Sequence, residues 1–137
     1  MEIFFHREEV KTDVKEKKRI KDWIKATINS EGKTGETINI IFTSNSKIKY
    51  LNRKYLKRNY ITDIIAFNYN RDDLISGDLF LNPETIKKNA GKYKTKFSEE
   101  ILRVIIHGVL HLIGYNDKNK EEKLVMKEKE NLFLERF

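Results

Sequence analysis

One segment of this chain constrains the fold more than any other, because it is apolar on nearly every side of a helix. It follows Ser98-Glu99-Glu100 and ends before Gly114. Its apolar residues are Ile101, Leu102, Val104, Ile105, Ile106, Val109, Leu110, Leu112 and Ile113. A helix without a polar face is stable only where other elements surround it. We therefore expect this helix in the middle of the protein.

Strand and helix patterns alternate along the rest of the chain. Short apolar and β-branched runs predict strands at Glu2–His6, Thr37–Phe42, Asp63–Tyr69 and Gly77–Leu81. The helical patterns cover Val10–Ser30, a segment capped by Ser44 or Ser46, a segment that starts at Asn82-Pro83, and Lys118–Phe137. We predict an α+β fold, a small mixed β-sheet covered by helices, with residues 1–137 as a single domain.

Two of these helices carry explicit predictions of buried residues. In the helix capped by Ser44 or Ser46, one face contains Ile48, Leu51 and Tyr55. In the last helix, we expect the buried side chains to be Leu124, Val125, Leu132 and Phe133.

Composition narrows the class of protein. The chain has no cysteine, so disulfides and thiolate-bound metals are excluded and any metal must bind to imidazole and carboxylate groups. The 28 basic and 21 acidic side chains give a net charge of +7. Such an excess favours a polyanionic partner, nucleic acid before acidic membrane, although lysine-rich surfaces also occur without one.

We expect a cytoplasmic protein with no membrane association. The first residues turn charged too early for a secretory signal. The uncharged stretch Val104–Asn116 is shorter than the ~20 apolar residues that span a bilayer.

Two of the three histidines, His107 and His111, lie four residues apart on the predicted central helix. This spacing places both side chains on one face, where two neutral imidazoles can bind one divalent ion. Gly114 is a natural end for the helix, and the turn after it can return Asp117 to the histidine face. Two imidazoles and one carboxylate leave coordination positions for water and substrate.

Spacing alone leaves two interpretations open, a metal site and a pair of buried structural histidines. Gly108 stands where a zinc protease of the HExxH type has its general base, which argues against peptide or other small-substrate hydrolysis. Its missing side chain would leave room for a ligand or a close backbone. Phosphodiester cleavage needs less from the protein, because RNA carries its own 2′-hydroxyl nucleophile.

Three segments resemble the YbeY family of rRNA maturation factors with endoribonuclease activity. HGVLHLIGYND (107–117) resembles the family's HGxLHLxGYDH signature. LNRKYLKRNYITDIIAFNY (51–69) is similar to LNxxYRxxDxPTDVLSFP, and SGDLFLN (76–82) to the GDIxIS strand. The resemblance implies a zincin-like fold, one zinc ion, and action on single-stranded RNA. It also implies maturation of the small-subunit rRNA 3′ end and ribosome quality control, with rRNA and the small ribosomal subunit as partners.

The resemblance assigns the metal ligands to His107, His111 and Asp117, although the family's third ligand is usually histidine. Asn116 is a rival for that position, but a neutral amide oxygen is the poorer ligand. Two nitrogens and one oxygen suit zinc and also nickel or manganese.

A second departure concerns the arginine that the family is thought to place on the scissile phosphate, which is Leu56 here. We predict that Lys57 and Arg58 supply this charge as catalytic residues. Together with Arg53 and Lys54 these cations are interleaved with Tyr55 and Tyr60, so an RNA strand could run along them with a base stacked on a tyrosine. The other interpretation is a solvated helix face with Tyr55 in the core, and it is the favoured one for Arg53 and Lys54.

The prediction is therefore a metal-dependent, single-strand-specific endoribonuclease, with a monomer favoured. The alternative is an RNA-binding ribosome-assembly factor, weakly catalytic or non-catalytic, with a structural metal. Asp63 and Asp78 are expected to be turn or capping residues without an assigned chemical role, and His6 a structural residue.

Overall fold

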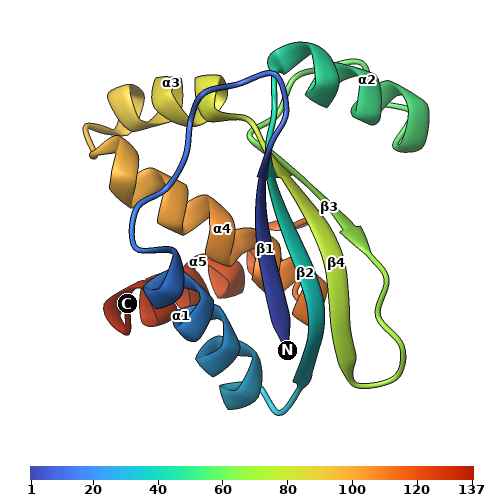
Figure 1. Ribbon diagram of the computed structural model, residues 1–137, viewed down its shortest axis with the longest axis vertical. Coiled ribbons are helices and arrows are strands. Elements are labelled where there is room, and N and C mark those ends of the chain that lie inside the picture. Colours follow the sequence, from blue (N-terminus) through green and yellow to red (C-terminus); the bar gives the residue numbers. More distant parts are fainter.

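A computed structural model describes residues 1–137. The strands are β1 (Glu2–Arg7), β2 (Thr34–Phe42), β3 (Ile64–Asn68) and β4 (Leu74–Leu81). The helices are α1 (Lys17–Ser30), α2 (Asn45–Tyr55), α3 (Pro83–Tyr93), α4 (Phe97–Ile113) and α5 (Lys120–Glu135). One mixed sheet with helices packed on it confirms the predicted α+β class (Figure 1). No helix is both long and apolar enough to cross a bilayer.

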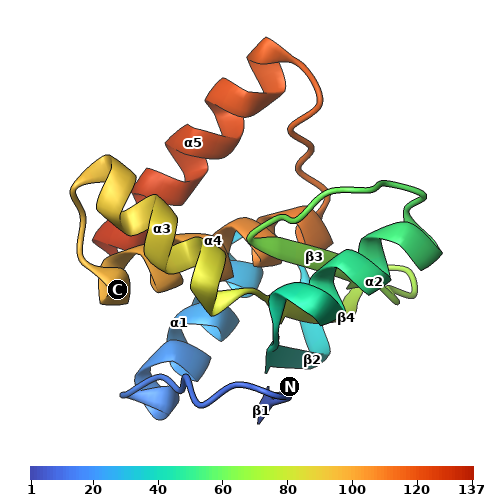
Figure 2. The same ribbon diagram turned by 90° about the horizontal axis from the view of Figure 1, so that it is seen from above.

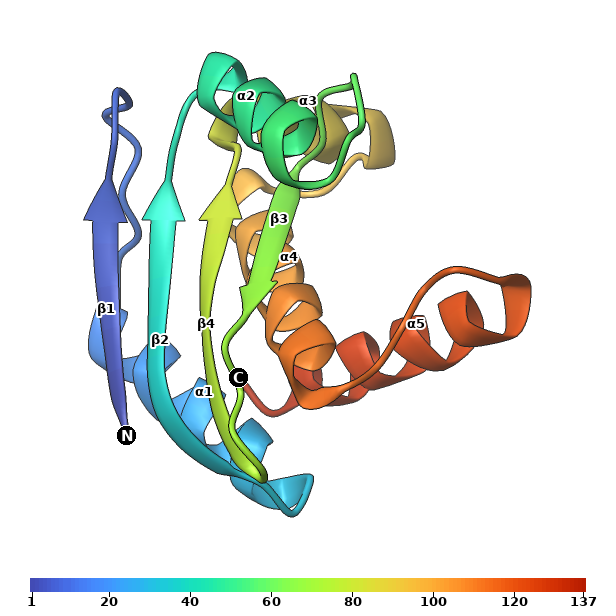
Figure 3. The same cartoon turned by 90° about the vertical axis from the view of Figure 1, so that its right-hand side faces the viewer.

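The sheet has the strand order β1-β2-β4-β3. Strands β1, β2 and β4 are parallel, and β3 pairs antiparallel with β4, from Ile64 opposite Leu81 to Asn68 opposite Gly77. The predicted strand pair is therefore confirmed. Because β3 lies at the edge of the sheet, its outer side faces no further strand, and α4 passes beside it (Figure 3).

Helix α4 lies in the centre, as its all-round apolar surface predicts. It packs against β3 and β4 on one side and against α1, α3 and α5 on the others. Its residues Ile105, Ile106, Val109 and Leu110 have no exposed surface. Helix α5 returns across α4 and its N-terminal end projects away from the sheet (Figure 2).

Two helices start at the capping residues that the sequence analysis indicates, and a third has a cap that it did not name. The Ser44 side chain accepts a hydrogen bond from the Lys47 backbone N–H (3.2 Å), so Ser44 rather than Ser46 caps α2. Asn82 caps α3, with Pro83 at its first position. Asn119 and Glu122 form a reciprocal capping box at the start of α5. Each cap satisfies backbone N–H groups that a helix N-terminus leaves unpaired.

The predicted start of the first helix at Val10 is wrong, because α1 begins at Lys17. Glu16 has a left-handed backbone (φ 57°), which a helix does not continue through. Val10 and Val14 still pack against the core, but from an irregular segment.

The prediction that Tyr55 is buried with Ile48 and Leu51 is also wrong. Ile48 and Leu51 are buried, but Tyr55 is 54% exposed. Tyr55 is the last residue of α2, and its ring contacts the sheet only edge-on, at Phe67.

The predicted buried face of the last helix is mostly wrong. Phe133 is buried as expected, but Leu124, Val125 and Leu132 are exposed. The face that packs against the protein contains Met126, Glu130 and Phe133 at helical spacing. A buried glutamate on this face requires a polar partner, and that partner is in the site described next.

Candidate metal centre

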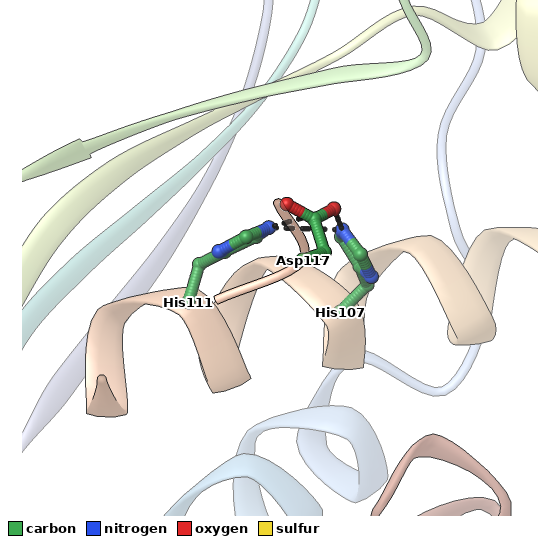
Figure 4. Close-up of side chains that lie close together, drawn as sticks. All are labelled: His107, His111 and Asp117. Atoms are coloured by element: carbon green, nitrogen blue, oxygen red, sulfur yellow. Dashed lines mark hydrogen bonds and ion pairs between the residues drawn. The ribbon is translucent and has the colours of Figure 1, made fainter. Parts of the chain in front are cut away.

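Three ligand-type atoms converge at the C-terminal half of α4 (Figure 4). His107 Nε2 lies 3.0 Å from His111 Nε2 and 3.4 Å from Asp117 Oδ2, and His111 Nε2 lies 3.5 Å from that same oxygen. In a tetrahedral site with zinc bonds of about 2.0–2.1 Å, neighbouring ligand atoms are about 3.3–3.4 Å apart. The triangle therefore fits an ion of this size, and its members are the three residues that the sequence indicates.

The turn after α4 brings Asp117 back to the histidine face. Gly114 has φ 129°, a conformation that favours glycine, and its N–H is bonded to the carbonyl groups of Leu110 and His111. The Tyr115 hydroxyl donates a hydrogen bond to Glu31 at the end of α1, which fixes the turn against the rest of the fold. Asn116 lines the adjacent cleft, and the oxygen in the triangle belongs to Asp117.

The carboxylate of Glu130 determines which nitrogen of His107 faces the triangle. His107 Nδ1 lies 2.6 Å from Glu130 Oε2, and Arg103 donates a hydrogen bond to the other oxygen, Oε1 (2.9 Å). Because an ionised carboxylate can only accept, Nδ1 must carry the proton of this hydrogen bond. His107 Nε2 then presents a lone pair toward His111 and Asp117. In many metal sites a carboxylate accepts the second ring N–H of a metal-ligating histidine and so fixes the orientation of the ring.

The electrostatic environment moves the pKa values of the two imidazoles in opposite directions. Burial lowers the pKa of His107, but the hydrogen bond to Glu130, the charge of Glu130, and the charges of Asp117 and Asp63 outweigh it, so the net pKa is raised. Burial and the neighbouring His107 lower the pKa of His111, against the opposing effect of Asp117. Two nitrogens and a carboxylate that face one another in this way favour a bound cation.

A cleft of about 730 Å³ opens from the triangle. The lining comes from β3, from α4 with the turn after it, and from the loop that follows α2. Asp63 lies in this cleft, so the expectation that it is only a turn or capping residue is incomplete.

Of the two predicted catalytic cations, only Arg58 lines the cleft. Lys57 is exposed, has a left-handed backbone (φ 53°), and is not among the lining residues. Leu56, at the position of the family arginine, also lines the cleft.

Gly108 permits close packing of α4 on the sheet. A Cβ at this position would lie 2.6 Å from Ile64 Cδ1 and 3.0 Å from Leu79 Cδ2. The space is therefore filled by side chains of β3 and β4, and neither a ligand nor a close backbone occupies it. Without a carboxylate at this position, the helix offers no in-motif general base.

Sequence reasoning missed Glu130 and Arg103, and it misplaced Asp78. Asp78 lies within β4 and accepts a hydrogen bond from Asn39 (3.0 Å), so it is not a turn or capping residue. His6, which bonds the same Asn39, is exposed on β1. A usable signal for Glu130 was its spacing, since Met126, Glu130 and Phe133 share one helix face.

The antiparallel edge strand beside a central helix with two histidines is the zincin-like arrangement that the resemblance implies. Comparison with known proteins agrees with it. The solution structure of TM1509 from Thermotoga maritima superposes with a TM-score of 0.65 at 28% identity, over 98% of this chain and 87% of that one.

Sequence comparison identifies the family. Endoribonuclease YbeY of Parabacteroides distasonis is 44% identical over 134 residues, which cover 98% of this chain and 94% of the relative. Endoribonuclease YbeY of Bacteroides thetaiotaomicron is also 44% identical over 134 residues, with 98% of both chains covered. The sequence profile described as Endoribonuclease YbeY matches residues 2–137. The chain therefore belongs to the YbeY family.

Proposed function

We propose that this protein is a metal-dependent endoribonuclease that cleaves single-stranded RNA in the maturation of ribosomal RNA. The observation that carries the proposal is the triangle of His107, His111 and Asp117 at the wall of an open cleft. The names of the relatives, all endoribonucleases, support it. The non-catalytic assembly factor is correspondingly not favoured.

The metal ligands in this proposal are His107, His111 and Asp117. They would hold a divalent ion, which would supply Lewis acidity toward a phosphoryl oxygen of the substrate. We propose zinc, because the separations within the triangle suit its tetrahedral geometry, although nickel and manganese accept the same donor types. Glu130 acts as a positioning residue, since its bond to Nδ1 directs Nε2 of the neutral His107 ring at the ion.

Other residues of the cleft have separate tasks. Arg58 carries a guanidinium that can bind the scissile phosphate with two parallel hydrogen bonds. Asp63 is a carboxylate of the cleft outside the triangle, and we assign to it the acceptance of the proton from the attacking hydroxyl group. Lys57, outside the cleft, is a weaker candidate for contact with the reacting phosphate.

Several finer expectations stay predictions. The net charge of +7 supports rRNA and the small ribosomal subunit as partners, because both are polyanionic. A profile match over residues 2–137 supports a single domain. Action at the small-subunit 3′ end, ribosome quality control, a cytoplasmic location and a monomeric state rest on the resemblance and the composition.

The proposal is tested by metal content and cleavage measured together. The protein is purified without a histidine tag, and bound metals are quantified by mass spectrometry for the wild type and Asp117→Ala. We expect about one zinc ion per chain in the wild type, as in mononuclear sites, and much less in the variant. Cleavage of a single-stranded RNA should fall in parallel.

Asp22→Ala is the matched control, because Asp22 is an exposed aspartate on α1, remote from the cleft. It should retain both metal and cleavage. A wild type that binds no stoichiometric metal when zinc is supplied, or an Asp117→Ala variant that cleaves normally, would refute the metal-dependent mechanism.

A further inference from the structure

The positive charge of the chain is concentrated in one segment. Residues 44–62, which comprise α2 with the loop after it, contain no aspartate or glutamate. Their six basic residues are Lys47, Lys49, Arg53, Lys54, Lys57 and Arg58. When these six are removed from the 28 basic residues of the chain, 22 remain against 21 acidic ones. Nearly all of the net charge of +7 therefore lies on this segment.

None of these six cations is paired with a carboxylate. The salt bridges of the protein all involve other basic groups, such as Lys17, Arg71 and Lys129. The cations of the segment contact neutral groups instead. Lys54 donates to the Tyr50 hydroxyl (3.0 Å), and Arg58 donates to the Tyr60 hydroxyl (3.1 Å). Their charge is thus available to an external anion.

Exposed aromatic rings lie between these cations. Tyr50, Tyr55 and Tyr60 are 50%, 54% and 51% exposed, so their rings contribute little to the core. The Lys54 ammonium lies 5.5 Å from the ring centre of Tyr50 and 5.3 Å from that of Tyr55. Alternating rings and cations are the combination that binds single-stranded nucleic acid, because bases stack on the rings while phosphates pair with the cations.

This surface continues into the cleft. Helix α2 buries Ile48, Leu51 and Asn52, and its opposite side, with Lys49 and Arg53, faces solvent at one end of the molecule (Figure 1). The segment then leads into the loop whose Arg58 and Tyr60 line the cleft. Helix α2 is about 16 Å long and packs on the side of the sheet that carries Ile65, Phe67 and Phe80, so the loop connects its surface with the cleft around the edge strand β3.

We propose that this surface, defined by Tyr50, Tyr55 and Tyr60 with the six cations and here termed the tyrosine–lysine track, binds the single-stranded RNA that extends out of the cleft. The inference rests on the proposed function. Phosphates bind along α2, and unstacked bases lie on the tyrosine rings. An acidic membrane is the weaker alternative, because the apolar side of α2 is already packed against the sheet and cannot insert into lipid.

The track predicts a dependence on RNA length. Fluorescence anisotropy would measure the binding of labelled single-stranded RNAs of about four and about sixteen nucleotides, the range of site sizes in such domains. Tyr50→Ala should weaken binding of the long RNA roughly tenfold and leave the short RNA nearly unchanged. Tyr50→Phe should retain wild-type affinity, since stacking does not need the hydroxyl group.

Salt dependence identifies the cations. Lys54→Ala should make the slope of log affinity against log salt shallower by about 0.7 for the long RNA, the value for one lost contact with a single strand. Lys87→Ala and Lys88→Ala on α3 are the controls, because both lysines are exposed and unpaired but lie outside the track. Neither control should change the slope.

The outcomes separate this inference from the proposed function. If Tyr50→Ala and Lys54→Ala weaken binding of the long RNA as predicted but the wild type does not cleave RNA, the track stands and the proposed function fails. If the protein cleaves RNA but Tyr50→Ala and Lys54→Ala bind the long RNA as the wild type does, the track is refuted. Loss of binding to anionic phospholipid vesicles in these variants, with RNA binding intact, would also overturn it.

Discussion

The metal centre is built from buried side chains that bond to one another, whereas the tyrosine–lysine track is built from exposed side chains without acidic partners. At the metal centre, the imidazole of His107 is mostly buried and is held by Glu130, which is itself held by Arg103. On the track, Tyr50 and Lys54 are exposed, and none of the six cations forms a salt bridge. Packing and hydrogen bonds determine the first region, whereas the second depends on composition and on the absence of acidic partners.

This difference separates two properties of the enzyme. A site built from buried, mutually bonded groups is sensitive to the loss of any one of them. A surface built from independent exposed contacts loses affinity in small increments. Chemistry should therefore depend on few residues and RNA affinity on many, and four experiments test this, from the largest expected effect to the smallest.

His111→Ala should give the largest effect. Loss of one of three ligands should reduce cleavage at least about a hundredfold, because the group that stabilises charge at the phosphate is lost. Binding of the long RNA should stay within about twofold, since the track is intact. Cleavage kinetics and anisotropy on one preparation, with circular dichroism for the fold, measure both. A parallel loss of RNA binding in a folded variant would show that the two regions are not separable.

Glu130→Ala should weaken metal affinity by about 10–100-fold, the usual effect of removing a partner that orients a ligand. Competition with a chromophoric chelator measures this without an activity assay. Glu130→Gln should recover part of the affinity, because its amide oxygen can still accept the Nδ1 proton of His107. Glu128→Ala, on the exposed side of the same helix, is the control. Equal affinities for all three variants would limit Glu130 to a structural role.

Leu56→Arg should increase cleavage about tenfold, because it restores a guanidinium at the position of the family arginine in the cleft. The Leu56 side chain is 39% exposed, so a longer side chain fits without disturbing the core. Leu124→Arg on α5 adds the same charge at another exposed leucine and should not raise the rate. If both variants gain equally, the gain reflects net charge alone.

The smallest changes in cleavage rate are expected for Arg58→Ala and Lys57→Ala. With the short RNA, Arg58→Ala should lower the cleavage rate about fivefold to tenfold, because Arg58 lines the cleft. Lys57→Ala should change it by less than about twofold, since Lys57 lies outside the cleft and exposed charges contribute little. A larger effect at Lys57 would place the reacting phosphate further out than the structure suggests.

Much of the fold could be predicted from local patterns. The apolar surface of α4 requires a central position, and the caps at Ser44 and Asn82 mark where α2 and α3 begin. The start of α1 could not be predicted, because Val10 and Val14 are apolar yet pack from an irregular segment. Local periodicity does not report which tertiary partner an apolar residue finds.

The candidate metal centre also contains a tertiary partner that local patterns do not report. His107, His111 and Asp117 fall within eleven residues of sequence, so their spacing and the glycine turn predict their proximity. Glu130 comes from the next helix, and its partner His107 is 23 residues away. The buried side of α5 combines this polar contact with Met126 and Phe133, so leucines such as Leu124 and Leu132 are exposed against a simple count of apolar residues.

The position of Glu130 on α5 has a consequence for the coupling between metal binding and folding. The three ligands come from α4 and its turn, whereas the carboxylate that orients His107 comes from α5. A bound ion should therefore stabilise the docking of α5 on α4, and a loosened α5 should lower metal affinity even where the three ligands are intact.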